Sequence, residues 1–414
     1  MHRFNRISWA AALMAAAMSA QAPGRQKRTV SDAEVQKVHR SALLIDTHND
    51  VTSATVDGLD IGVRRGDGHT DLARLKEGGV GATFFAVFVA ASYVEGNRAG
   101  NRTLQMIDTV RHDIVEKYPA EFEFATTAEG IVAARKKGKF AALMGIEGGH
   151  AIEDSLRLLR DFHALGIRYM TLTHTNSNSW AGSSGDPANK GLTAFGREVV
   201  LEMNRLGMMV DISHVSDQTF EDALAVSQAP IFASHSSCRS LAGHARNMTD
   251  GMIAAMAKKG GVIQINFACE YLSEEARRSS PMGNPAMRAK FAAVMAEMKG
   301  KPPEERRAKM RELMASAGPR VRAKLSDVVA HINHVVKIAG IDAVGIGSDY
   351  DGVGCVPEGL DDVSKYPNLT RALLEEGYTA AEIRKIYGEN LLRMMRAVEK
   401  TAASFKKPAA GPKS

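Results

Sequence analysis

Short apolar runs alternate with helical patterns along most of this chain. There are eight such runs, bounded by Gly and polar residues, and all but the first follow a stretch with helical periodicity. They span residues 42–48, 81–90, 140–148, 167–174, 207–214, 229–235, 260–267 and 343–351. Near-continuous apolar strands suit a parallel sheet that is covered on both faces. Eight of them alternating with helices predict an α/β fold of the (β/α)₈ TIM-barrel type.

A doubly wound sheet is the competing fold, and it often carries a Gly-rich fingerprint after its first strand. Here "DTHNDV" follows instead. The expected helix boundaries fit an alternation of strands and helices. Gly207 is expected to end the helix before the fifth strand, and Ser216 to cap the start of the helix after it.

The first 22 residues have the organisation of a secretory signal peptide. A basic start precedes an Ala-rich apolar stretch, and Ala20-Gln21-Ala22 fits the small-residue cleavage rule. Cleavage after Ala22 predicts an exported, periplasmic protein without a stable membrane anchor. An uncleaved anchor is the alternative, but the apolar stretch is short for a membrane span.

The remaining chain is predicted to hold one barrel domain, residues 30–400, and a flexible C-terminal tail, residues 401–414. Residues 272–325 interrupt the rhythm between the seventh and eighth strands and are rich in Ala, Met, Lys, Arg and Glu. They predict a helical insertion that serves as a lid, an oligomer contact or a surface decoration. The sequence does not decide whether the protein forms a homodimer.

Charge and cysteine usage exclude several classes of protein. The net charge of +6 is concentrated in residues 272–325, where 13 Lys and Arg face six Glu and Phe291 is the one aromatic residue. That segment is expected to be solvated helix, which argues against a nucleic-acid partner. Cys238, Cys269 and Cys355 form no zinc-thiolate spacing, and small buried thiols are favoured over a single disulfide.

Metal-ligating side chains recur where the predicted strands end, which is the edge of a barrel that carries active sites. They are His48 and Asp50 after the first strand, Glu147 after the third, His174, His214 and His235 after the fourth to sixth, and Asp349 and Asp351 after the eighth. Any one His in a polar loop is usually an ordinary hydrogen-bonding residue. Four His residues at strand ends, however, favour a metal site. His48, Asp50, His214 and His235 could each ligate one of two zinc ions, with Glu147 reaching both.

The other polar residues near these strand ends acquire roles once metals are assumed. His174 would stabilise an oxyanion, and Asp349 would act as general base and then general acid. Arg246 could grip a substrate carboxylate, or form a surface ion pair. Asp46 is expected beside the ligands, and His150 either orients Glu147 or opens the next helix.

The blocks that carry these residues resemble those of a known family. "DTHND", "GIEGGH", "YMTLTHTNSNSWA", "VDISHVS", "FASHSSCRSLAGHARNMTD", "GGVIQINF" and "GIGSDYDGVGCVPEGLDDVSKYPNL" are similar to motifs of the membrane (renal-type) dipeptidases, in the same order, between about residues 40 and 400. That family belongs to the amidohydrolase superfamily.

The resemblance implies a (β/α)₈ barrel with two zinc ions that hydrolyses free dipeptides by attack of a metal-bridging hydroxide. Some members tolerate a D-residue at the C-terminal position. It implies His48 and Asp50 as ligands of one zinc, His214 and His235 as ligands of the other, and Glu147 as the bridging carboxylate. It further implies His174 as the oxyanion-stabilising residue, Arg246 as the carboxylate-binding residue and Asp349 as the acid and base.

The chain departs from the mammalian pattern in lacking a lipid-anchor signal and evident disulfide cysteines, and in its long 272–325 insertion. Another amide or lactone hydrolase of the superfamily is an alternative, although His-x-Asp follows the first strand here and not His-x-His. A non-catalytic peptide-binding homologue is a second alternative, which the complete set of five ligands disfavours.

Overall fold

In the described part of the chain, nine parallel strands are present, and eight of them form the centre of the molecule. The computed structural model describes residues 25–281, 283–298, 301, 305, 308–310, 312–313, 316 and 320–405; the expected signal peptide lies outside them. The strands are β1 (Leu44–Asn49), β2 (Val80–Phe88), β3 (Phe122–Phe124), β4 (Phe140–Glu147), β5 (Ile167–Thr171), β6 (Met209–Asp211), β7 (Ala233–Ser236), β8 (Ile263–Ile265) and β9 (Val344–Ile346). All eight predicted strands are present, and β3 is an addition.

Two sheets join to close the barrel. One runs in the order β1-β2-β4-β5-β6, with β3 paired to β4, and the other in the order β7-β8-β9. A parallel bridge between Asp211 and Phe232 links β6 to the start of β7, and one between Asn49 and Tyr350 links β1 to the chain after β9. The eight predicted strands therefore form a ring, and β3 lies outside it.

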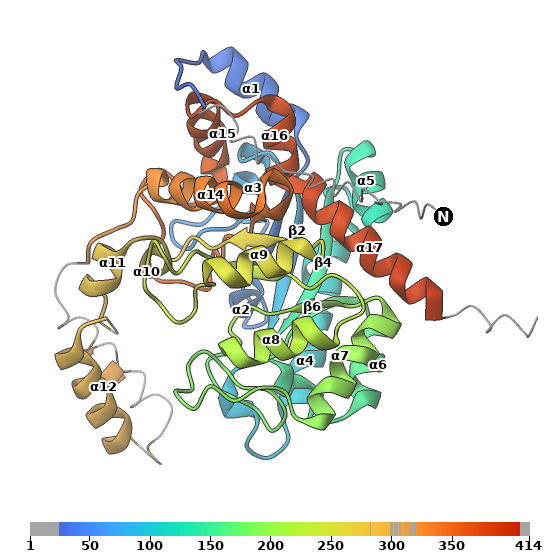
Figure 1. Cartoon of the computed structure of the whole chain (residues 1–414), viewed down its shortest axis with the longest axis vertical. Helices are drawn as coiled ribbons and strands as arrows, with labels where there is room; N and C mark the ends of the chain where they lie inside the picture. The colour runs from blue at the N-terminus through green and yellow to red at the C-terminus, as the bar shows by residue number, and fades with distance from the viewer. Residues whose placement is uncertain are drawn as a thin grey trace, which may run out of the picture.

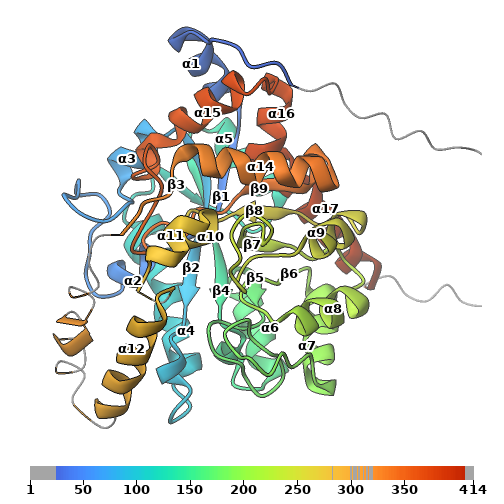
Figure 2. The ribbon, with the colours of Figure 1, turned by 60° about the vertical axis from the view of Figure 1, so that its left-hand side comes forward.

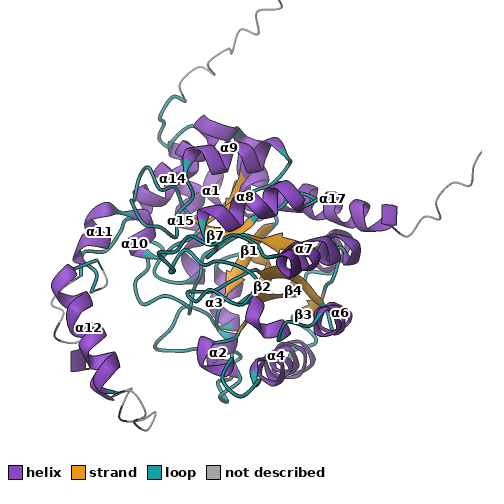
Figure 3. Cartoon of the chain, turned by 60° about the horizontal axis from the view of Figure 1, so that its bottom comes forward, coloured by secondary structure: helices purple, strands orange, loops and turns teal. Residues whose placement is uncertain are grey.

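Helices surround this ring on its outer side (Figures 1 and 3). The main ones are α1 (Asp32–Ser41), α3 (Leu72–Glu77), α4 (Ala99–Asp108), α5 (Ala128–Lys136), α6 (Leu156–Ala164), α7 (Ala194–Leu206), α8 (Asp217–Val226), α9 (Asp250–Lys258), α14 (Leu325–Ala339), α15 (Tyr366–Glu375), α16 (Ala380–Arg384) and α17 (Asn390–Phe405). Among the described residues, none of the helices is both long enough and apolar enough to cross a bilayer.

The predicted helix ends are confirmed where they were most specific. Gly207 follows α7 with a φ of 82°, a left-handed conformation that glycine adopts without a Cβ clash. The Ser216 side chain accepts a hydrogen bond from the Thr219 backbone N–H at 3.0 Å and so caps α8. α17 continues to Phe405, so residues 401–405 of the expected tail are helical instead.

Helices occupy much of the described part of the chain between β8 and β9. α10 (Cys269–Leu272) and α11 (Glu274–Ser279) lie near the barrel, whereas α12 (Pro285–Glu297) projects away from it (Figures 1 and 2). Met287 is the only residue of α12 that is fully buried. Of these three helices, α12 therefore has the least contact with the barrel.

Cys269 and Cys355 form a disulfide across 86 residues, which corrects the expectation of buried thiols for these two. Cys238 is free and buried, as expected. Sequence periodicity cannot reveal this pairing, because it depends on the loops after β8 and β9 meeting in space. The bond encloses the whole insertion.

Replacing Cys269 and Cys355 together with Ser should lower the free energy of unfolding by about 2–5 kcal/mol, because the disulfide restricts the unfolded chain. Urea unfolding of both proteins measures the difference. Adding a reductant should lower the midpoint of the native protein and leave that of the double variant where it was. Equal midpoints for the two proteins without reductant would contradict a stabilising role.

Candidate metal centre and active site

Glu147 stands at the centre of the predicted site, at the carboxyl end of β4. Its Oε1 lies 3.0 Å from His214 Nε2 and 3.2 Å from His235 Nε2, and its Oε2 lies 3.6 Å from His48 Nε2. These three imidazoles come from the ends of β1, β6 and β7. One carboxylate thus touches histidines from both sheets.

Asp50 completes the set on the β1 side. Its Oδ2 lies 3.2 Å from His48 Nε2. The donor atoms of His48, Asp50 and Asp349 form one group close enough for a metal ion, and those of His48, Glu147 and His235 form another. The structure thus brings all five predicted ligands to one place.

The donor atoms fit a metal ion. His48 Nε2 and Asp50 Oδ2 are buried and have no hydrogen-bond partner among the described residues. Buried polar atoms without a partner are costly unless something outside the protein satisfies them. Imidazole nitrogen and carboxylate oxygen without thiolate is a donor set that suits zinc.

A second layer of side chains orients the histidine rings. The Tyr169 hydroxyl lies 2.7 Å from His48 Nδ1, and the Ser234 hydroxyl lies 2.7 Å from His235 Nδ1. Asp211 accepts hydrogen bonds from the Ser234 hydroxyl and backbone N–H, at 2.6 and 2.8 Å. Each ring therefore turns its Nε2 toward Glu147.

The sequence analysis missed these orienting residues. A tyrosine inside a buried strand, and a buried Asp three residues before His214, were the available signals. Gly145 belongs to the same arrangement, because a Cβ there would lie 1.9 Å from the Tyr169 ring. Asp46, in contrast, binds the Ser348 backbone N–H at 2.8 Å and the Tyr366 hydroxyl at 2.9 Å, and so ties β1 to the chain after β9.

Three of the predicted ligands, Glu147, His214 and His235, have pKa values that favour the protonation states that bind metals. Burial raises the pKa of Glu147, but the imidazoles of His48 and His174 and hydrogen bonds from His214 and His235 outweigh it, so the pKa lies well below its ordinary value. Burial, reinforced by the charge of Arg246, holds the pKa of His214 and of His235 well below the ordinary value. An ionised carboxylate and neutral imidazoles are the forms that bind metals.

Asp349 lies beside the ligands, in the loop after β9. Its Oδ2 accepts a hydrogen bond from the Asn266 side-chain amide at 2.8 Å, and its backbone has a φ of 63°. Burial raises the pKa of Asp349 well above its usual value, the charge of His48 opposes the increase, and Asp50 and Glu147 add to it. A carboxyl with a raised pKa holds a proton more readily than an ordinary Asp does.

His174 lies on the open side of the cluster. Its Nε2 is 3.8 Å from Glu147 Oε1, farther than the other histidines, and its ring centroid is 4.5 Å from that of His214. Burial lowers the pKa of His174, so the ring is neutral at pH 7. His174 can therefore contact a ligand in the cavity as well as the residues of the cluster.

Arg246 is buried, so the surface ion pair considered from the sequence is wrong. Its two terminal nitrogens donate to the Ser236 hydroxyl at 2.7 Å and the His235 carbonyl at 2.8 Å. Its Nε has no partner among the described residues, and its guanidinium carbon lies 5.8 Å from the Tyr271 ring centroid. The arrangement fixes a cation next to the cluster.

His150 does not orient Glu147 through any described hydrogen bond. Its Nε2 lies 2.8 Å from the Val89 carbonyl, and the residue belongs to the short 3₁₀ helix Gly149–Ile152. His150 is the second residue of that helix, and α6 begins later, at Leu156, so it opens neither helix.

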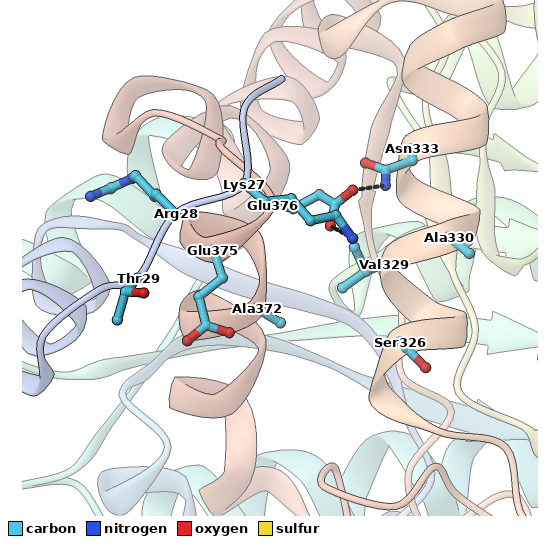
Figure 4. Close-up of a pocket in the computed structure, with 10 residues that line it drawn as sticks. All are labelled: Lys27, Arg28, Thr29, Ser326, Val329, Ala330, Asn333, Ala372, Glu375 and Glu376. Atoms are coloured by element: carbon cyan, nitrogen blue, oxygen red, sulfur yellow. Dashed lines mark hydrogen bonds and ion pairs between the residues drawn. The ribbon is translucent and has the colours of Figure 1, made fainter. Parts of the chain in front are cut away.

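A cavity of about 470 Å³ opens over the cluster. Its lining residues are Asp50, Ser53, Phe88, Glu147, His174, Thr175, His214, Glu270, Tyr271, Asp349, Asp351, Gly352, Val353 and Gly354. A larger cavity of about 690 Å³ lies elsewhere, between the N-terminal segment, α14 and α15 (Figure 4). It contains an ion pair between Lys27 and Glu376 and no histidine, so the smaller cavity is the candidate active site.

Comparisons with known proteins find relatives of this chain among the dipeptidases. An uncharacterized dipeptidase of Schizosaccharomyces pombe is 33% identical over 405 residues, which cover 92% of this chain and 87% of the relative. The crystal structure of the probable dipeptidase PvdM from Pseudomonas aeruginosa aligns with a TM-score of 0.77 at 27% identity, covering 89% of this chain and 98% of PvdM.

A metallo peptidase from Rhodobacter sphaeroides, solved with a phosphinate mimic of the dipeptide L-Ala-D-Ala, aligns with a TM-score of 0.69 at 25% identity, covering 86% of this chain and 99% of the other. The family model for membrane dipeptidases, peptidase family M19, matches residues 32–409. The chain that carries this histidine and carboxylate cluster therefore belongs to the membrane dipeptidase family.

Proposed function

We propose that this protein is a zinc-dependent dipeptidase that holds two metal ions. His48, Asp50 and Glu147 would bind one ion, and Glu147, His214 and His235 the other. The observation that carries the proposal is the position of Glu147, whose Oε1 faces His214 and His235 and whose Oε2 faces His48. When bound, two zinc ions lower the pKa of water and supply hydroxide at neutral pH.

The chain's own residues would position the substrate. Arg246 would bind the terminal carboxylate of the dipeptide through its unpartnered Nε–H. His174, neutral and on the open side of the cluster, would donate to the oxygen of the scissile carbonyl as negative charge develops there. Asp349 would take up a proton and deliver it to the leaving amine.

Tolerance of a D-residue at the C-terminal position is part of the proposal. It is supported by the L-Ala-D-Ala mimic bound to the Rhodobacter sphaeroides relative. Export to the periplasm is also proposed, and the Cys269–Cys355 disulfide supports it, because such bonds persist mainly in oxidising compartments.

The test is amino-acid release from L-L, L-D and D-L dipeptides, with tripeptides and N- or C-blocked dipeptides as controls. Cleavage restricted to free dipeptides, including those with a C-terminal D-residue, is the expected result. Binding without cleavage would point to a peptide-binding homologue. Cleavage only of other amides or of lactones would replace the dipeptidase assignment.

Arg246→Ala should raise KM for free dipeptides roughly ten- to a hundredfold, because a charge-assisted contact to the carboxylate is lost. Dipeptide amides, which lack that carboxylate, should show a much smaller change. Steady-state kinetics on matched acid and amide substrates measure both. An equal change in KM for the acid and the amide substrates would show that Arg246 does not bind the carboxylate.

A further inference from the structure

The Cys269–Cys355 disulfide lies directly beside the cavity over the metal cluster. Residues 270–271 follow Cys269 in the chain, residues 353–354 precede Cys355, and all four line that cavity. The bond therefore joins two segments of the cavity wall that are far apart in the sequence. The proposed function gives neither segment a part in binding or in the reaction.

On the α10 side of the disulfide, Tyr271 packs against the segment that carries Arg246. Its ring centroid lies 4.7 Å from that of His244 and 5.8 Å from the Arg246 guanidinium carbon. The Tyr271 carbonyl accepts a hydrogen bond from the Asn247 side-chain amide at 2.9 Å. A shift of Tyr271 would therefore change the surroundings of the cation that is proposed to bind the substrate's carboxylate.

On the other side of the disulfide, Val353 and Gly354 have little local support. Neither residue forms a backbone hydrogen bond with another described residue, and Gly354 is exposed. The Cys355 carbonyl, in contrast, accepts a hydrogen bond from the Cys269 backbone N–H at 3.0 Å. Segments with few hydrogen bonds open locally at a low cost in free energy. The disulfide and this hydrogen bond therefore tie residues 353–354 to α10.

The groups proposed to carry out the reaction are held by contacts that do not involve the disulfide. The Asp349 backbone N–H donates to the His48 carbonyl at 3.0 Å, and the Asp349 Oδ2 accepts from the Asn266 amide at 2.8 Å. The predicted metal ligands lie at the ends of β1, β4, β6 and β7. Loss of the disulfide should therefore weaken contacts with the substrate more than it disturbs the metal ligands or Asp349.

We propose that the Cys269–Cys355 disulfide is a positioning element for substrate binding, because it holds residues 270–271 and 353–354 in place around a bound dipeptide. The inference rests on the proposed dipeptidase function and extends it. Opening the bond should raise KM, whereas kcat and the bound zinc should be retained. A bond that only stabilised the fold would lower the fraction of folded enzyme and leave KM unchanged.

The bond is accessible to a small reductant in the native protein. Both cysteines line a hollow of about 70 Å³ beside the cavity, and Cys355 is half-buried. A water-soluble phosphine, TCEP, reduces a disulfide to two thiols with hydrogen from water, whose oxygen ends in the phosphine oxide. A dithiol is less suitable, because thiolates are zinc ligands. Thiols counted after unfolding should rise from one, Cys238, to three.

The test measures KM, kcat and bound zinc with Ala-Ala as substrate, for the native enzyme before and after TCEP and for the variant that combines Cys269→Ser with Cys355→Ser. The reduced enzyme and the double variant should each show KM raised about five- to tenfold, with kcat within about twofold of the native value. Reoxidation of the reduced enzyme should restore KM. If the double variant does not fold, the reduced native enzyme provides the comparison alone.

Two controls separate the bond from other effects. TCEP should leave the kinetics of the double variant unchanged, which excludes an action of the reductant on the metal ions. Cys238→Ser, which removes the free and buried cysteine, should keep the native KM.

Two results would overturn the inference and leave the proposed function standing. One is an unchanged KM in the fully reduced enzyme, as expected if the bond only stabilises the fold. The other is loss of zinc on reduction, as expected if the bond supports the metal cluster itself. Absence of zinc-dependent cleavage of any dipeptide by the oxidised native enzyme would instead overturn the proposed function.

Discussion

Glu147→Gln should yield a folded protein that binds fewer than two metal ions per chain and has lost kcat by roughly 10⁴-fold or more. Gln has the shape of Glu but not its charge. The distances of 3.0, 3.2 and 3.6 Å to three imidazoles leave no other described carboxylate in that position. Metal analysis of the purified variant and steady-state kinetics on a dipeptide measure the two effects.

The matched control is Glu153→Gln, six residues further along the chain. Glu153 accepts a hydrogen bond from the Gly100 backbone N–H at 2.8 Å and lies outside the cluster. This variant should keep both ions and its activity. Full metal content in Glu147→Gln would contradict the shared-ligand role.

Asp349→Asn is expected to separate catalysis from metal binding. It should retain two ions per chain and reduce kcat roughly 10²- to 10⁴-fold, because an amide cannot take up and return the proton. Asn preserves the size of the side chain and can still contact the Asn266 amide through its oxygen. Kinetics and metal analysis on the same preparation give both values.

Loss of a metal ion in Asp349→Asn would contradict this assignment and make Asp349 a ligand, a role its proximity to His48 and Asp50 leaves geometrically open. Asp351→Asn serves as the control, since it removes a charge from the same loop and Asp351 has no assigned part in the reaction. Its kcat should fall far less than that of Asp349→Asn. Thermal unfolding of each variant verifies folding.

The barrel was predictable because its strands are apolar and alternate with helical segments. Gly207 and Ser216 mark helix ends with local chemistry that the sequence displays directly. β3 has only three residues, Phe122–Phe124, and pairs with the first three residues of β4, so no run of apolar residues reveals it. Its existence depends on a neighbour, not on its own sequence.

The candidate ligands were predictable for a related reason. A parallel barrel brings all strand ends to one edge, so His48, Glu147 and His235 could be grouped without knowing any distance. Contacts that depend on side-chain orientation could not be anticipated. Tyr169 against His48 is one such contact, and the burial of Arg246 is another.

The most direct test of the account is a zinc titration of chelated protein, with bound metal and hydrolysis of a free dipeptide followed together. The chelated protein should be inactive. Activity should return with added zinc and level off at two ions per chain, while Glu147→Gln should not recover. Full activity after chelation, or a plateau at a single ion, would contradict a two-metal site built on Glu147.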